Sequence, residues 1–256
     1  MQSPALSPLF LFLGLVILLI GCLFSLPSIP LTIQHHQFAS QVSYWGIPAF
    51  TLIFSSLCLV SVGVFGLIKH TRYTLNTDLI TGLITFLIAL ILSGIGSAIY
   101  HWNPQDQTIL FKQIPISILC MGLSFSLLVS QSKLASWGWF YGLMMAYAIL
   151  SPIYGIYAHQ VQIYYATQFF PIALMILLIA RIWSSSYTTS LIYGVIFLVL
   201  GKGAEISDHE IYQWTTQWVD GQMCANLLYA LGYFKAFQFF SQMRPRELLV
   251  EDMSGV

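Results

Sequence analysis

The chain has 256 residues, of which 57% are apolar and only 7% are charged. A soluble domain carries about a quarter charged residues, so this composition excludes an ordinary soluble domain and is typical of a polytopic membrane protein. Lys plus Arg and Asp plus Glu number nine each, which leaves no basic surface for nucleic acid and no acidic tail.

Long apolar runs predict eight membrane-spanning helices, because one span needs about 20 apolar residues. They lie at about residues 8–26, 48–69, 79–100, 113–131, 136–154, 163–183, 187–203 and 217–241. An alternative for the first run is a signal peptide, since Leu19-Ile20-Gly21-Cys22 resembles a lipoprotein cleavage box. Residues 1–8 contain no Lys or Arg, however, which favours an uncleaved span.

The basic residues predict how these spans are oriented. With eight spans, the side that holds both termini receives Lys69, Arg72, Lys133, Arg181, Lys235, Arg244 and Arg246, whereas the other side receives only Lys112 and Lys202. Both termini are therefore predicted to be cytoplasmic. Most acidic residues fall on or near the other side.

Polar residues recur at the predicted ends of four spans. They are Ser97 and His101 in the third span, Lys112 before the fourth, Lys202, Glu205 and Asp208 after the seventh, and Asp220, Gln222 and Asn226 at the eighth. Polar groups are costly in a membrane, so these positions are the first candidates for function. The four cysteines lie singly in apolar stretches and are interpreted as buried apolar residues.

The order of these motifs resembles the CREST superfamily of membrane hydrolases, in particular its bacterial alkaline ceramidase-like branch. Ser97-x3-His101 is similar to the family's Ser-x3-His, and Lys202-x2-Glu205-x2-Asp208 is similar to its Lys-x2-Glu-x2-Asp segment. Further similar stretches are His35-His36-Gln37-Phe38-Ala39-Ser40, Gly46-Ile47-Pro48-Ala49-Phe50 and Gln168-Phe169-Phe170-Pro171. The similarity runs from about residue 35 to residue 240.

The resemblance implies a catalytic zinc site that this chain has altered. In the family, zinc is held by the histidine of Ser-x3-His and by two histidines of a C-terminal His-x3-His, while the serine and an aspartate serve the zinc-bound water and the transition state. The corresponding positions here are Ser97, His101, Lys112, Gln222 and Asn226. Neutral amides are poor zinc ligands and an ammonium repels the metal, so no cofactor is expected. The family's calcium site is also expected to be missing, because residues 1–77 contain no Asp or Glu.

Each altered position has two interpretations. Gln222 and Asn226 either coordinate the polar head of a substrate or form hydrogen bonds with Ser97 and His101 across helices, and the second is favoured. Lys112 either snorkels to the interface or takes the place of the lost cation, bonding Gln222, Asn226 or Ser97 and pairing with Asp106 or Asp220. The spacing of Lys202 and Glu205 predicts an ion pair, and with Asp208 and Asp220 we interpret it as a structural latch between helix ends.

We therefore expect an all-α integral membrane protein with three parts. These are an extra N-terminal helix (1–30), a seven-helix CREST-like domain (31–242) and a short cytoplasmic tail (243–256). The expected function is that of a pseudoenzyme in a bacterial inner membrane, which binds a membrane lipid or serves other membrane subunits. The alternatives are an active amide hydrolase on a lipid, using Ser97 and His101 with zinc, and a small-molecule transporter, although the chain has no inverted repeat.

Overall fold

The computed structural model describes residues 38–40, 42–70, 77–130, 138–183, 185 and 187–253, with side chains as far as Gln242 and except for His70. The predicted first span at 8–26, His35 and His36 lie outside the described residues. Within the described part the chain is helical, apart from turns, bends and isolated bridge residues such as Tyr44 and Ile47, which pair with each other. The all-α prediction is therefore confirmed for this part of the chain.

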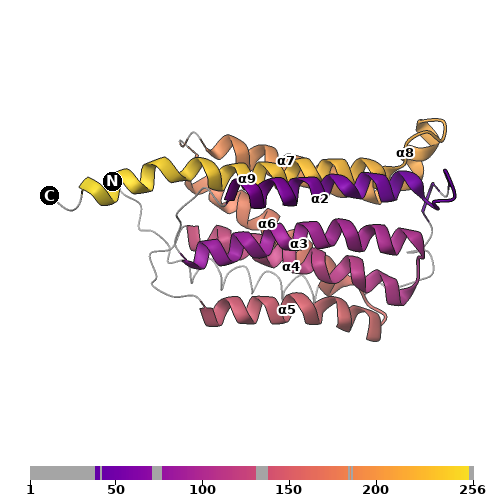
Figure 1. The fold of residues 1–256 in the computed structure, drawn as a ribbon, viewed down its shortest axis with the longest axis horizontal. Helices are drawn as coiled ribbons and strands as arrows, with labels where there is room; N and C mark the ends of the chain where they lie inside the picture. The colour runs from indigo at the N-terminus through magenta and orange to yellow at the C-terminus, as the bar shows by residue number, and fades with distance from the viewer. Residues whose placement is uncertain are drawn as a thin grey trace.

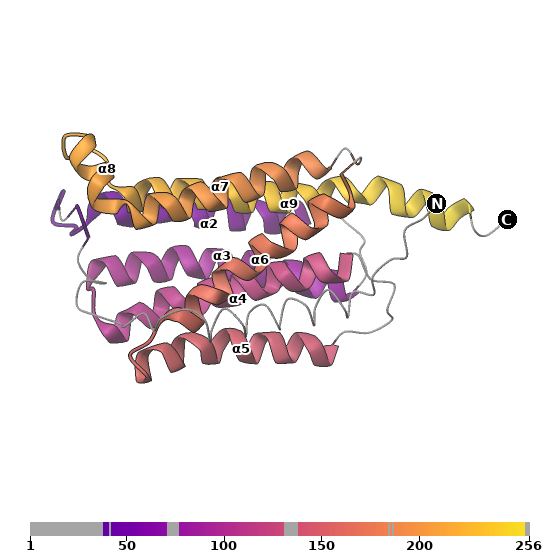
Figure 2. The same cartoon turned by 180° about the vertical axis from the view of Figure 1, so that it is seen from behind.

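Eight helices follow one another along the described part of the chain. They are α2 (Phe50–His70), α3 (Thr77–Trp102), α4 (Asp106–Ser130), α5 (Gly138–Tyr157), α6 (Gln162–Arg181), α7 (Thr188–Ile206), α8 (Asp208–Trp214) and α9 (Gly221–Met253). All but the short α8 run back and forth along one axis, with α6 oblique to the others (Figures 1 and 2). Six of them, α2 to α7, are long and apolar enough to cross a membrane.

Three differences between the predicted and the observed helices are the most informative. Helix α4 begins at Asp106, seven residues before the predicted start at 113. The prediction began where the apolar run begins, whereas the polar residues before that run are also helical. The Thr108 hydroxyl stabilises the preceding turn by donating to the Asn103 carbonyl (2.6 Å) and accepting the Gln105 N–H (3.0 Å). The polar helix α8 was not predicted, and α9 continues past the predicted span as far as Met253.

Six helices form a closed ring of contacts in the order α2, α3, α4, α6, α7, α9 and back to α2. Helix α5 contacts α4 and α6 and is not part of this ring. In Figure 2, α6 crosses obliquely between α4 and α7. Because consecutive long helices are antiparallel, one end of the ring holds the ends of α3 and α7 together with the starts of α2, α4, α6 and α9 (Figures 1 and 2).

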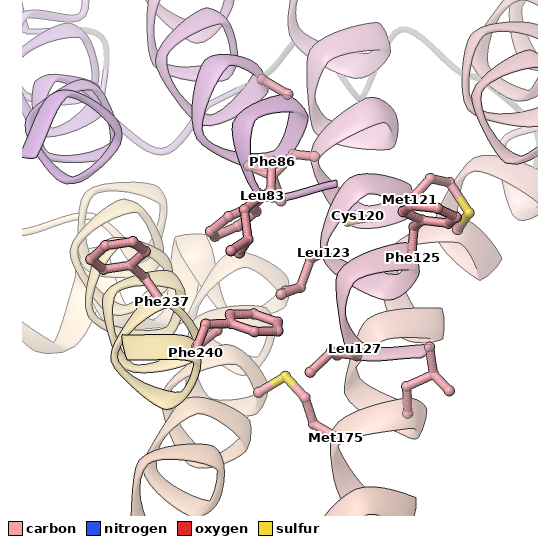
Figure 3. Close-up of a cluster of buried hydrophobic side chains, with 14 of the residues drawn as sticks. Leu83, Phe86, Cys120, Met121, Leu123, Phe125, Leu127, Met175, Phe237 and Phe240 are labelled. Atoms are coloured by element: carbon pink, nitrogen blue, oxygen red, sulfur yellow. The ribbon is translucent and has the colours of Figure 1, made fainter. Parts of the chain in front are cut away.

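The apolar core occupies the other half of the bundle. Figure 3 shows Leu83 and Phe86 of α3 facing Leu123 of α4, with Phe237 and Phe240 of α9 on the opposite side. These five side chains are at most 5% exposed. In a membrane, close packing of side chains holds helices together without a hydrophobic driving force, so this half supplies much of the contact between α3, α4 and α9. The polar residues singled out in the sequence are left in the half where α8 lies.

Candidate functional site

A pocket lies inside the ring, near the end where α3 and α7 finish and α4 and α9 begin. This is the right-hand end of the bundle in Figure 1. All six ring helices contribute to its lining. The polar residues of the lining include Ser97, Lys112, Lys202, Glu205, Gln222 and Asn226, and the apolar ones include Leu59, Ile116, Leu119, Phe169, Ile172 and Leu198. Six of the nine residues singled out from the sequence therefore share one pocket of about 60 Å³.

Two glycines let the helices approach closely enough to form this pocket. A Cβ atom on Gly96 would collide with the Phe111 carbonyl oxygen and would lie 3.2 Å from the Lys112 nitrogen. A Cβ atom on Gly221 would collide with the Ala204 carbonyl oxygen. Each glycine thus places a pocket residue beside a neighbouring helix: Ser97 follows Gly96, and Gln222 follows Gly221.

Lys202 and Glu205 form the ion pair that their spacing predicts, with 2.8 Å between Lys202 Nζ and Glu205 Oε2. Lys202 also donates to Gln168 Oε1 of α6 (2.9 Å), and the Tyr229 hydroxyl of α9 donates to the same Glu205 oxygen (2.6 Å). The lysine ammonium lies 4.6 Å from the centre of the Tyr165 ring, within cation–π range. This network joins α6, α7 and α9 at one point.

Asp208 and Asp220 both cap α9, and each also holds a segment near the start of α2. Asp208 Oδ1 accepts the Gln222 N–H (2.9 Å), and its Oδ2 accepts the Ala39 N–H (2.9 Å). Asp220 Oδ1 accepts the Met223 N–H (2.6 Å), and its Oδ2 accepts the Thr51 hydroxyl (3.1 Å). Burial raises the pKa of the Asp220 carboxyl, while these hydrogen bonds act in the opposite direction. The negative charges also face the positive end of the α9 dipole.

Replacing Asp208 by Ala is expected to lower the free energy of unfolding by about 1–3 kcal/mol, because two N–H groups lose their acceptor. The matched control is Glu210→Ala, since Glu210 is exposed in the same short helix and its loss should change stability by less than about 0.5 kcal/mol. Denaturant titration in mixed micelles measures both. Equal unfolding free energies for the two variants would show that Asp208 is not a latch.

Ser97 and His101 are both buried, at 2% and 1% exposure. Within the described residues, neither the Ser97 hydroxyl nor either His101 ring nitrogen has a hydrogen-bond partner. The His101 ring instead packs against Phe38, with ring centres 4.5 Å apart. Ser97 lines the pocket and His101 does not. The two residues therefore do not form a hydrogen-bonded nucleophile–base pair in this conformation.

Asn226 forms a hydrogen bond across helices, but its partner is not the one predicted. Asn226 Nδ2 donates to the Ser55 hydroxyl of α2 (2.9 Å) and not to Ser97 or His101. The prediction of a cross-helix hydrogen bond for Asn226 is confirmed, but the predicted partners, Ser97 and His101, were wrong. The face of α9 that carries Asn226 is rotated toward α2, which the sequence pattern of α9 alone does not reveal. Sequence reasoning missed several partners of the site residues, among them Ser55, Thr51 and Tyr229.

Lys112 lines the pocket together with Gln222 and Asn226, but it forms neither the predicted hydrogen bonds nor the predicted ion pair within the described part of the chain. Its ammonium lies 5.5 Å from the centre of the Tyr100 ring. Lys112 therefore shares the pocket with the altered positions, while the pairing with Asp106 or Asp220 was wrong.

The donor set of this pocket does not fit a zinc ion. The ligand positions that the resemblance implies are Gln222 and Asn226, which line the pocket with neutral amides, and His101, which does not line it, while two lysine ammoniums share the pocket. Catalytic zinc needs about three imidazole or carboxylate ligands with one open position. Across the residues described, no three His, Cys, Asp or Glu side chains come together to hold a metal.

The chain matches no family model, and no curated protein is significantly similar to it. The resemblance to the CREST superfamily thus rests on the motifs and their order.

Proposed function

We propose that this chain is a ceramidase-like membrane protein that has exchanged zinc-dependent hydrolysis for binding of a lipid's polar group, and that it acts as an accessory subunit in a membrane assembly. One observation carries the proposal. Ser97, Lys112, Gln222 and Asn226 come from three helices and line one pocket, although these positions supply no zinc-ligand set.

The pocket's composition supports a lipid as its ligand. Polar groups line it on α3, α4, α7 and α9, and apolar side chains such as Leu59, Ile116 and Leu198 line it as well. By the same volume measure one water needs roughly 10–15 Å³, so about 60 Å³ suits a small polar group with its first carbons and not a whole lipid. A membrane-embedded amphiphile presents its polar group in this way.

Metal analysis of the purified protein tests the loss of the zinc site. We expect far less than one zinc per chain for the natural sequence, because amide and ammonium groups replace the ligands. The triple variant Lys112→Asp, Gln222→His, Asn226→His should gain about one zinc if only the ligands were lost. About one zinc per natural chain would overturn the proposal.

Two further readouts test the binding role itself. Lipid extraction from the purified full-length chain, followed by mass spectrometry, should find a membrane lipid in about stoichiometric amount. Purification in mild detergent should retain partner subunits. A chain that elutes alone and free of lipid would contradict both parts of the proposal.

An active amide hydrolase is the second candidate, and one observation favours it. Ser97 and His101 lie one turn apart with polar atoms that have no partner in the described structure, and catalytic hydrogen bonds are often formed only with substrate bound. This candidate predicts release of fatty acid from ceramide by the natural chain and loss of that release in Ser97→Ala. Absence of release at all substrate concentrations would exclude ceramide hydrolysis.

A further inference from the structure

Three charged side chains line the pocket, and only two of them neutralise each other. Lys202 and Glu205 are paired at 2.8 Å and are largely buried, with side-chain exposures of 12% and 22%. Lys112 is the third, and no carboxylate of the described residues forms an ion pair with it. The pocket therefore holds one ammonium whose charge is not balanced by direct contact.

The other carboxylates at this end are already engaged or lie outside the pocket. Both oxygens of Asp208 accept N–H groups, and both oxygens of Asp220 accept hydrogen bonds from Met223 and Thr51. Neither residue lines the pocket. Asp106 and Glu210 are exposed, in the first turn of α4 and in α8.

The remaining acidic residues of the sequence belong to helix turns that lie away from the pocket end of the bundle. Asp78 lies in the first turn of α3, at the opposite end of the bundle. Glu247, Glu251 and Asp252 lie in the last turns of α9, also away from the pocket end. Among the described residues, no carboxylate therefore forms a direct ion pair with Lys112, and only Glu205 and Asp208 interact with its charge at longer range.

A hydroxyl group without a partner lines the same pocket. Ser97 Oγ is inaccessible to solvent and has no hydrogen-bond partner among the described residues, and its side chain is 2% exposed. Gly96 brings α3 against the backbone of Phe111 and Lys112, so the hydroxyl and the ammonium come from adjacent, closely packed helices. A buried hydroxyl without a partner is costly, and the Lys112 ammonium is partly buried without a carboxylate in direct contact. A ligand that satisfied both would recover these costs.

We propose that the pocket binds a singly charged oxyanion, with Lys112 as its counter-ion and Ser97 as its hydroxyl donor. A carboxylate or a phosphodiester has the required charge and the acceptor oxygens, and the cavity admits a group of that size. This inference rests on the proposed function only in taking a lipid as the source of the anion. A free carboxylate or inorganic phosphate has the same chemistry and is separated from a lipid by the test.

The test compares a long-chain fatty acid with the fatty alcohol of the same chain length, each titrated into the full chain in neutral detergent and followed by thermal stability and by calorimetry. The natural chain should bind the acid at least about tenfold more tightly than the alcohol, a difference expected for a charge-assisted hydrogen bond. Lys112→Met should abolish this preference, Lys112→Arg should retain it, and Ser97→Ala should reduce it. The control is Lys235→Met, because Lys235 is bound to Gln238 on α9 and does not line the pocket.

Each outcome distinguishes the oxyanion site from the lipid-binding function. Equal binding of acid and alcohol by the natural chain, or an unchanged preference in a Lys112→Met protein that elutes as a single folded species, overturns the oxyanion site while leaving lipid binding intact. Lys112-dependent binding of acetate or inorganic phosphate without binding of any lipid supports the oxyanion site and refutes lipid binding. If Lys112→Met does not fold, Lys112→Arg and Ser97→Ala are compared with the natural chain. An equal preference for the acid over the alcohol in all three proteins overturns the oxyanion site.

Discussion

Replacing Gly96 by Ala is expected to lower the free energy of unfolding by about 3 kcal/mol or more, because overpacking that moves backbone costs about 1–3 kcal/mol and sometimes more. The new Cβ atom would collide with the Phe111 carbonyl oxygen and would lie 2.6 Å from the carbonyl carbon. Both atoms belong to the α4 backbone, so relief requires α3 and α4 to separate and not merely a side chain to rotate.

The chain provides a matched control in α5. Gly142 is an exposed helical glycine, and a Cβ atom at this position would have no other atom within 4 Å. Gly142→Ala should raise stability by about 0.5–1 kcal/mol through helix propensity. Denaturant titration in micelles gives both values. If a folded Gly96→Ala protein no longer shows Lys112-dependent anion binding, Gly96 also positions the pocket residues. If the two variants shift stability in the same direction, α3 and α4 are not in backbone contact at Gly96.

Replacing Glu205 by Ala is the second substitution with a large expected effect, about 3–5 kcal/mol of destabilisation, because removing one partner of a buried pair has a cost of that size. It leaves the Lys202 ammonium buried without its carboxylate. It also removes the acceptor of the Tyr229 hydroxyl. Gln168 and the Tyr165 ring still contact the ammonium, which keeps the expected loss near the lower end.

A triple replacement distinguishes a buried-charge penalty from simple loss of packing. Lys202→Met, Glu205→Leu and Tyr229→Phe together remove the charges and the hydroxyl while keeping similar volumes, so the variant should unfold within about 1 kcal/mol of the natural chain. The same triple variant should keep Lys112-dependent anion binding, because the pair contributes no net charge to the pocket. Additive losses from the three single substitutions would show that the network contributes through packing alone.

The seven described long helices coincide with apolar runs that the sequence predicted as spans, and six of them, α2 to α7, are long and apolar enough to cross a membrane. The sequence did not predict α8, whose seven residues are mostly polar, nor the polar first turns of α4, because hydropathy does not detect helix that lies beyond an apolar run. The pairing of Lys202 with Glu205 was predictable because it is local, three residues apart on one helix.

Contacts between helices were harder to predict, because they depend on how each helix is rotated about its axis. Asn226 bonds Ser55, 171 residues away, and no local pattern specifies that pairing. The resemblance grouped Ser97, Lys112, Gln222 and Asn226 from their order along the chain, and they do line one pocket. The resemblance did not indicate that Lys112 would form no ion pair. The carboxylates of Asp208 and Asp220 accept hydrogen bonds from other groups, and the sequence does not show those contacts.

The seam between α2 and α9 has a consequence for biosynthesis. It joins the first described helix to the last through Asn226–Ser55 and Asp220–Thr51, so the ring cannot close before the C-terminal helix has left the ribosome. Chains are made from the N-terminus at about 5–20 residues per second, which leaves Ser55 and Thr51 without these partners for on the order of ten seconds or more. During that interval the polar edge of α2 is open to membrane chaperones and proteases, and arrival of α9 removes it from their reach.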